Sequence, residues 1–586
     1  MKKTILIASL FLTLSACVKP NHNQSSSSST TTNDQVVYED QKDKHPSKTP
    51  TQKKETIAIE SDYEMEEAVA EPATSQAYDY KSKKSISRSE MKFHQPTPNE
   101  FYDQQPIQDF NTEGYAYTPE NDYKAVSADA LSTFSIDVDA ASYTNTRRFL
   151  NNGSLPPTDA VRIEEFINYF SYNYPAPTSD DPFSINTEYA PCPWKKGHQL
   201  IHIGLQGKRY DFKEMKAMNL VFLIDVSGSM SNQNKLPLLK KSFELLTKKL
   251  RAEDKISIVV YAGAAGLVLP ATSGTESETI MNALNSLNAG GSTAGGEGIN
   301  LAYEVAKENF ITNGINRVII ATDGDFNIGA SSDGEMTRLI EEKRNNGIFI
   351  TALGFGMGNY KDSKMETIAD KGNGNYFYID NLEEARKTLV TELDGTLNTI
   401  AKDVKIQIEF NPEKVKAYRL IGYVNRKLNN EDFNDDKKDA GELGAGHTVT
   451  ALYEIIPAGS NEEISTSVDE LRYQKTTKTP TTTSSSNEIA TVKLRYKQPE
   501  GTESKLLVQH VEDKKKGPIS ETFNFSAAVA GFGMLLSKSN YSNNMTYKNI
   551  IDWAVASKGE DTEGYRSEFI QLVKMAELLD SSEAKN

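Results

Sequence analysis

Five oxygen-bearing side chains that could bind a metal ion follow the ends of predicted strands. They are Asp225, Ser227, Ser229, Thr293 and Asp323. The first three come directly after the apolar run 219–224, the threonine lies in the glycine-rich loop 289–298, and the second aspartate follows a strand predicted at 317–321. A hard cation such as Mg²⁺ prefers oxygen ligands. Two carboxylates and three hydroxyls would supply them.

The region that must position these side chains alternates predicted strands and helices. The strands are expected at 219–224, 256–261, 267–269, 317–321, 348–353 and 376–379. Helices are expected at 276–287, 296–310 and 334–344, and around Leu239, Phe243, Leu246 and Leu250, whose spacing follows one helix face. Repeated βα units predict a doubly wound, mostly parallel α/β sheet. Ligands of such sheets bind beyond the carboxyl ends of strands, where the five residues fall.

This pattern resembles the von Willebrand factor type A (VWA) domain family. The metal-ion-dependent adhesion site of that family combines a DxSxS motif, a threonine and the aspartate of a Thr-Asp-Gly turn, and all three are present here in order. The resemblance covers residues 216–396. It implies that the five side chains hold Mg²⁺, or alternatively Mn²⁺ or Ca²⁺. It also implies a protein ligand whose exposed Asp or Glu fills the remaining coordination position.

Each piece of this motif also has an ordinary structural explanation. Asp and Ser commonly cap helices, and Asp-Gly commonly marks turns. Three matching pieces at three strand ends favour the metal site. A structural scaffold with a vestigial site is the alternative. Asp325, just past the Thr-Asp-Gly turn, is either an outer neighbour of the metal or a solvated loop residue.

Residues 1–17 have the pattern of a lipoprotein signal peptide. Lys2 and Lys3 precede an apolar stretch at 5–14, which is too short to span a membrane. The following Leu-Ser-Ala-Cys resembles the lipobox of bacterial lipoproteins, in which the cysteine, here Cys17, is acylated. An ordinary cleaved signal with a chance cysteine is the alternative. We therefore expect a location in the bacterial cell envelope, with the lipid anchor as the membrane contact. In a Gram-negative cell we expect the outer membrane. The sequence does not indicate whether the protein faces the periplasm or the cell surface.

Residues 18–125 are predicted to form a disordered linker. They contain an unbroken Ser/Thr run at 25–32, scattered prolines and mixed charges, without a sustained apolar period. Aromatic residues become commoner between 101 and 123. That segment either docks on the folded region or is solvated.

Two flanking regions surround the predicted VWA domain. Residues 126–215 and 397–515 are rich in predicted strands, and 405–410 and 491–496 alternate polar and apolar residues. We predict that these flanks share one β-sandwich into which the VWA domain is inserted, with two independent small domains as the alternative. Residues 516–586 are predicted to be helical, with Tyr565, Phe569, Leu572, Ala576 and Leu579 on one helix face. The flanks resemble those of a bacterial envelope family that places a VWA domain between two such regions.

The composition argues against nucleic-acid binding and against a fold held by disulfides. The 586-residue chain has 65 Lys and Arg against 81 Asp and Glu, a formal net charge of −16, which disfavours nucleic-acid binding. Its two cysteines, Cys17 and Cys192, leave no disulfide framework once the first is lipidated. The sequence does not indicate an oligomeric state.

The sequence predicts a binding protein and not an enzyme. It contains no HExxH, GxSxG or paired Cys–His motif. His198 and His202 have the spacing of zinc ligands on a helix, but residues 199–204, which lead from one to the other, are predicted to form a strand. The alternative is a metal-assisted hydrolase of envelope polymers, for which Glu297 or Asp325 would be the general base.

Overall fold

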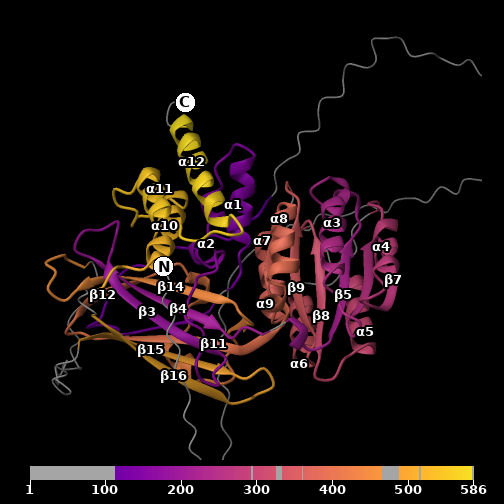
Figure 1. Cartoon of the computed structure of the whole chain (residues 1–586), viewed down its shortest axis with the longest axis horizontal. Coiled ribbons are helices and arrows are strands. Elements are labelled where there is room, and N and C mark those ends of the chain that lie inside the picture. Colours follow the sequence, from indigo (N-terminus) through magenta and orange to yellow (C-terminus); the bar gives the residue numbers. More distant parts are fainter. Residues whose placement is uncertain are drawn as a thin grey trace, which may run out of the picture. The chain divides into compact units, whose positions relative to one another are not determined.

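The computed structural model describes residues 113–136, 138–210, 212–291, 295–324, 333–358, 360–464, 487–513 and 517–583. The predicted signal peptide, Cys17 and most of the predicted linker lie outside these ranges. The described chain forms an α/β domain with a mostly parallel sheet, a β-sandwich and a layer of helices (Figure 1). The predicted fold class is confirmed.

The α/β domain is built on one sheet with the strand order β10-β9-β8-β5-β6-β7. Neighbouring strands are parallel, except that β7 runs antiparallel to β6. The strands are β5 (Met218–Asp225), β6 (Lys255–Ala262), β7 (Ala264–Ser273), β8 (Ile315–Thr322), β9 (Phe349–Phe355) and β10 (Tyr376–Ile379). The order of strands reverses at β5, which lies between β6 and β8. This is the switch point at which such sheets bind ligands.

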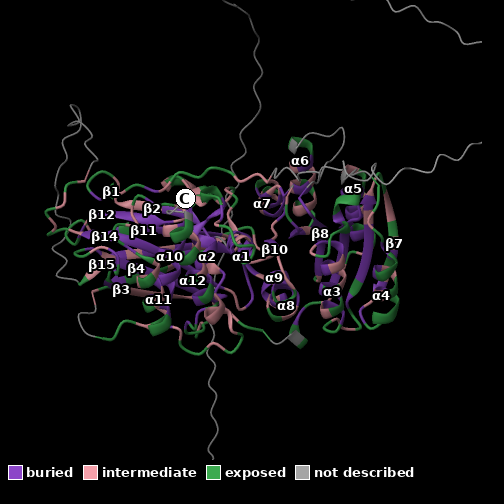
Figure 2. Ribbon diagram, turned by 90° about the horizontal axis from the view of Figure 1, so that it is seen from above, coloured by how far each residue is buried: buried purple, intermediate pink, exposed green. Residues whose placement is uncertain are grey.

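Helices cover both faces of this sheet (Figure 2). They are α3 (Leu236–Thr247), α4 (Ser277–Ser286), α5 (Gly295–Glu308), α6 (Asp333–Asn345), α7 (Asp362–Lys371), α8 (Leu382–Arg386), the π-helix η4 (Lys387–Thr391) and α9 (Leu393–Leu397). Every residue of β5 is buried, as its apolar run predicts for a strand covered on both sides. Phe222 packs on Phe243 of α3, with ring centroids 4.1 Å apart, while Leu223 joins the core on the α5 side.

Both flanks contribute strands to the two sheets of the sandwich, whose orders are β1-β12-β14-β4-β3 and β13-β11-β15-β16. The N-terminal flank supplies β1 (Lys124–Ala125), β2 (Leu131–Ser135), β3 (Phe183–Pro191) and β4 (Gln199–Gly207). The C-terminal flank supplies β11 (Thr399–Phe410), β12 (Val415–Ile421), β13 (Gly441–Gly444), β14 (Thr448–Pro457), β15 (Glu488–Lys497) and β16 (Ser504–Glu512). Strand β14 pairs with β4, and β11 pairs with β2. The shared sandwich is therefore confirmed, and two independent small domains are excluded.

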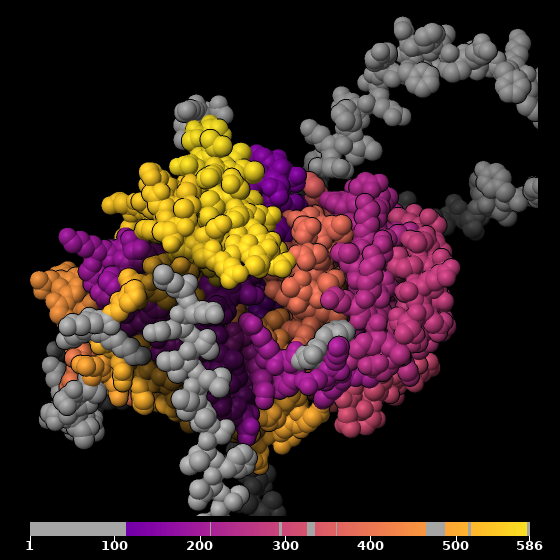
Figure 3. All heavy atoms as spheres, viewed as in Figure 1, coloured from indigo at the N-terminus to yellow at the C-terminus, as the bar shows by residue number. Residues whose placement is uncertain are grey.

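A layer of helices joins the two ends of the described chain. It contains α1 (Ala141–Asn151), α2 (Ile163–Asn168), α10 (Glu521–Leu536), α11 (Tyr547–Ala556) and α12 (Tyr565–Glu583). Figure 3 shows the C-terminal residues, in yellow, packed beside the indigo N-terminal flank. Phe166 and Phe170 of the N-terminal flank meet Phe532 and Phe525 of α10 at centroid distances of 6.1 and 5.1 Å. We call these helices and the sandwich the accessory module.

Helix α10 contains the apolar run 525–536, which is too short to span a membrane. Its residues are almost all buried against the other helices of the accessory module. Within the described ranges, no helix combines the length and apolar character needed to cross a bilayer. The 3₁₀ turns are η1 (Thr158–Ala160), η2 (Phe212–Glu214), η3 (Gly228–Ser231), η5 (Val424–Arg426) and η6 (Asn430–Asn434).

The described chain begins at Glu113, inside the region predicted as linker. The Glu113 carboxylate accepts two hydrogen bonds from Arg148 of α1, both at 2.8 Å. The Asn121 side chain donates to the carbonyl oxygens of Leu420 and Gly422 at 2.9 and 2.7 Å. From Glu113 onward, this segment docks on the folded region.

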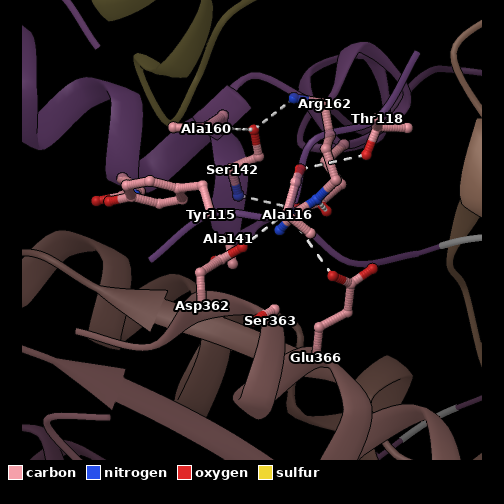
Figure 4. Close-up of polar contacts among 12 residues, drawn as sticks. Tyr115, Ala116, Thr118, Ala141, Ser142, Ala160, Arg162, Asp362, Ser363 and Glu366 are labelled. Carbon is pink, nitrogen blue, oxygen red and sulfur yellow. Dashed lines mark hydrogen bonds and ion pairs between the residues drawn. The ribbon is translucent and has the colours of Figure 1, made fainter. Parts of the chain in front are cut away.

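Buried ion pairs connect the accessory module to the α/β domain. Arg162, at the start of α2, donates to Asp362 of α7 at 2.7 Å and lies 3.7 Å from Glu366 (Figure 4). Arg162 also pairs with Glu165 of its own helix. A second arginine, Arg147 of α1, binds Asp380 at the end of β10 at 2.5 Å. Each of these arginine side chains is at most 5% exposed, so the pairs are shielded from solvent.

Burial alone would lower the pKa of Arg162, but the charges of Asp362 and Glu165 raise it well above its ordinary value. The guanidinium is therefore charged, and it balances carboxylates that are also desolvated. Removing one member of such a set leaves an uncompensated charge in the interior, which costs far more than losing a surface pair. These pairs fix the α/β domain against the accessory module.

We expect Arg162→Met to lower the free energy of unfolding by about 3–5 kcal/mol, because Asp362 and Glu165 would stay buried without their counter-charge. Arg386→Met is the matched control. The Arg386 side chain, which pairs with Glu383 and Glu563, is 38% exposed. Its replacement should therefore lower the free energy of unfolding by less than about 1 kcal/mol. Urea unfolding of both variants measures the difference. Equal losses would show that the Arg162 cluster does not hold the two parts together.

Candidate metal centre

Asp225 is the last residue of β5 and is fully buried. Its Oδ1 accepts a hydrogen bond from the backbone N–H of Ser227 at 2.9 Å. Its Oδ2 accepts from Tyr261 of β6 at 3.2 Å and from Thr322 of β8 at 3.0 Å. One carboxylate thus ties together the carboxyl ends of three adjacent strands.

The two serines of the motif lie in the short turn that follows β5. Their hydroxyl oxygens are 2.9 Å apart, within hydrogen-bond distance. Ser227 is buried, whereas Ser229 is exposed. Met230 is buried in the same core cluster as the apolar side chains of α3 and anchors the turn η3 to that core. Ser229 therefore marks the side from which solvent or a ligand reaches the site.

Asp323 follows β8 directly and is also fully buried. The ammonium of Lys235, the residue before α3, donates to its Oδ2 at 2.9 Å. Gly324, the next residue, has a φ of +92°, and a Cβ at this position would lie 2.6 Å from the backbone nitrogen of Lys361. Only glycine fits this turn, because its conformation is left-handed and its neighbour is backbone.

The fifth predicted ligand, Thr293, lies outside the described residues. The glycine-rich loop that leads to it is nevertheless attached to the serine turn. The N–H of Gly290 donates to the carbonyl of Val226 at 2.8 Å, and the N–H of Gly228 donates to that of Gly291 at 3.2 Å. The described part of the loop therefore ends next to the two serines.

The surroundings of Asp225 disfavour the ionised form of its carboxyl group. Burial raises the pKa of Asp225, and the neighbouring charge of Asp323 raises it further. Hydrogen bonds from Ser227 and Thr322 act in the opposite direction without cancelling the rise. A bound cation would relieve this unfavourable placement of two carboxylates, because positive charge stabilises the ionised form of both.

The donor set of the described residues fits a hard divalent cation. Asp225 and Asp323 offer carboxylate oxygens, and the two serines offer hydroxyl oxygens from one turn. Such a set suits Mg²⁺, which is typically held by one or two carboxylates and keeps several waters. No group of three or more His, Cys, Asp or Glu side chains in the described ranges is placed to hold a metal. The candidate site is of another kind, since hydroxyls complement only two acids.

Sequence reasoning missed two side chains of this site, Tyr261 and Lys235. Tyr261 ends an apolar strand and reads as a core residue. Lys235 lies ten positions after Asp225, at the start of an amphipathic helix, where lysines are normally solvated. No local pattern shows that its side chain turns inward. Only the packing of α3 against the loop after β8 reveals it.

Glu297, Asp325, His198 and His202 are the other candidate residues of the sequence. Glu297 is exposed in the first turn of α5, and Asp325 lies outside the described residues. His198 bonds to Glu454 and Glu462, both at 2.7 Å, whereas His202 bonds to Tyr174 at 3.0 Å. The two histidines therefore have separate partners; His202 lies in β4, and His198 directly precedes this strand.

Three families match the chain in succession. The von Willebrand factor family matches residues 109–202, the von Willebrand factor type A domain matches 219–392, and the family "Uncharacterized protein YfbK, C-terminal" matches 395–579. The chain is 44% identical over 473 residues to "Uncharacterized protein YfbK" of Escherichia coli K12, covering 80% of this chain and 81% of the relative. It is 24% identical over 213 residues to "Uncharacterized protein sll0103" of Synechocystis, covering 36% and 50% respectively.

Solved structures with the same type of domain are also similar. A von Willebrand factor type A protein from Catenulispora acidiphila has 14% identity and a TM-score of 0.37, covering 68% of this chain and 91% of that one. The ArnB paralog VWA2 from Sulfolobus acidocaldarius has 12% identity and a TM-score of 0.34, covering 68% and 98%.

We expect Gly324→Ala to destabilise the protein through the turn that carries Asp323. The left-handed φ should cost about 1–2 kcal/mol, and the clash with Lys361 should add about 1–3 kcal/mol. Gly358→Ala is the control, because Gly358 has a φ of +97° but nothing within 4 Å of the added carbon. Denaturant unfolding should show only the smaller loss for the control. Similar losses would mean that the contact between the turn and Lys361 is not tight.

Proposed function

Because the chain belongs to the YfbK family and contains a VWA domain, a domain that generally mediates protein interactions, we propose that it is a lipid-anchored, extracytoplasmic binding protein. It holds a protein ligand through a divalent cation at the carboxyl edge of the VWA sheet. The observation that carries this proposal is the convergence of Asp225, Ser227, Ser229 and Asp323 at the switch point of that sheet.

Asp225, Asp323 and the two serines would hold the cation, and Thr293 would join them from the glycine-rich loop. When bound, the cation supplies a coordination position that a carboxylate of the partner can occupy. Asp225 is pre-positioned by three hydrogen bonds, so it needs little rearrangement to bind. Ser229 is exposed and gives the site an open side. A partner with an accessible Asp or Glu is the ligand that such a site accepts.

The location rests on the sequence of the first 17 residues. A lipid on Cys17 would attach the chain to a bacterial envelope membrane, and the predicted linker would separate the anchor from Glu113, where the described fold begins. This arrangement suits a binding protein whose partner lies at a distance from the membrane surface. Lipid provides the membrane contact in this proposal.

We expect titration calorimetry of the full chain in detergent to show one bound Mg²⁺ or Mn²⁺. Asp225→Ala and Asp323→Ala should each abolish the binding, since each removes one of the two carboxylates of the site. The matched control is Asp552→Ala on α11, whose side chain is 58% exposed and pairs with Lys548 of the same helix. Circular dichroism checks that all variants are folded.

A folded parent chain that releases no heat and gains no thermal stability with either cation would contradict this proposal. Retained binding in both site variants would place the cation elsewhere. If the expected pattern is found, ligand capture from envelope extracts with and without chelator identifies partners whose binding depends on the cation.

We also expect Cys17→Ser to release the protein from membranes. Acylation requires the thiol, so the variant should move from the detergent phase to the aqueous phase in Triton X-114 partitioning of expressing cells. Cys192→Ser is the control, because that cysteine is buried in the accessory module. Membrane association that survives Cys17→Ser would rule out the lipid anchor.

A further inference from the structure

The cation that the structure already contains at this site is the ammonium of Lys235. Its Nζ lies 2.9 Å from Oδ2 of Asp323, and the two side chains are only 5% and 0% exposed. A lysine is almost never buried to this extent unless it is paired with an acid. The pair thus places one fixed positive charge against one of the two proposed metal ligands.

Packing holds this lysine in place along its whole length. Gly356, which follows β9 with a φ of +79°, faces the aliphatic part of the side chain. A Cβ at Gly356 would lie 2.1 Å from Cε and 2.6 Å from Cγ of Lys235. The stem therefore occupies the space that a larger residue would fill. At its other end, the backbone N–H of Lys235 donates to the carbonyl of Asn232 at 3.0 Å.

This placement has a direct consequence for a divalent cation. Two carboxylates and one ammonium give the site a net charge of −1 instead of −2. A metal that binds Asp323 either displaces the ammonium from Oδ2 or binds close to it. The first costs a buried ion pair, and the second costs repulsion between like charges at short range.

We infer that Lys235 is a built-in counter-ion that stabilises the cation-free site and weakens its affinity for divalent cations. This inference rests on the proposed metal site and deepens it. Lys235 acts as a positioning residue on Asp323 and as a competitor of the metal. The site then fills most readily when a ligand carboxylate adds negative charge, so the cation and the protein ligand favour each other's binding.

The test compares Lys235→Met with the parent as full chains in detergent. Methionine keeps an unbranched side chain over Gly356 and removes the charge. We expect the dissociation constant for Mg²⁺ in titration calorimetry to fall by about tenfold or more. In chelator, the melting temperature should drop below that of the parent, because Asp323 loses its counter-ion. Saturating Mg²⁺ should raise the melting temperature more in the variant than in the parent.

Lys241→Met is the matched control, since Lys241 lies on the same helix and is exposed. It should leave Mg²⁺ affinity unchanged. If Lys235→Met does not fold, Lys235→Gln replaces it, because the amide can still donate to Asp323 without a charge. The same tightening is expected.

The outcomes separate this inference from the proposed function. Tighter Mg²⁺ binding in the Lys235 variant than in the parent supports the counter-ion role of Lys235. Equal or weaker binding in a folded Lys235 variant overturns it while leaving the metal site intact. If neither the parent nor any folded variant binds Mg²⁺ or Mn²⁺, both the metal site and the counter-ion role fail.

Discussion

The burial of two carboxylates at the edge of one sheet is the constraint on which the geometry of the candidate site depends. Removing a carboxylate from water is costly unless hydrogen bonds or an opposite charge compensate it. Asp225 is compensated by donors from the turn after β5 and from the ends of β6 and β8, so these segments must converge on it. Asp323 is compensated by Lys235, which connects the start of α3 to the end of β8. The hydrogen-bond donors and the ammonium that stabilise the buried carboxylates therefore also determine the geometry of the site.

The same constraint operates where the VWA domain meets the accessory module. In the two buried pairs Arg162–Asp362 and Arg147–Asp380, the arginine belongs to the module and the acid to the VWA domain. Buried guanidinium–carboxylate pairs are directional, so they set the orientation of two parts as well as their attachment. An interface made only of apolar side chains would tolerate sliding more easily. The insertion of the VWA domain between strands of one sandwich adds a second restraint, because both of its ends lead into β-strands of the module.

Much of the VWA domain could be predicted from the sequence because its signals are local. The apolar run of β5 and the helical spacing of α3 depend only on neighbouring residues, and so does the DxSxS turn. Helix α7 was missed because its sequence is mostly polar and only a few residues, such as Met365 and Ile368, reach the core. Helix α1 buries polar side chains in place of an apolar stripe, so its length does not follow from an apolar period. Lys235 could not be predicted as part of the site, because its role depends on a partner 88 residues away.

One short segment after β9 connects the candidate site to the rest of the protein. Gly356 supports the stem of Lys235, and Tyr360 and the residue after it lie against the turn that carries Asp323. On its other side, the N–H of Gly358 donates to Glu113 at 2.8 Å, and the carbonyl of Tyr360 accepts from the N–H of Gly114 at 3.0 Å. The start of the described chain therefore holds the same segment that shapes the site. A fragment limited to residues 216–396 would lack these contacts and the Arg162 cluster. Cation affinity measured on such a fragment would describe a site with less support than the one in the intact chain.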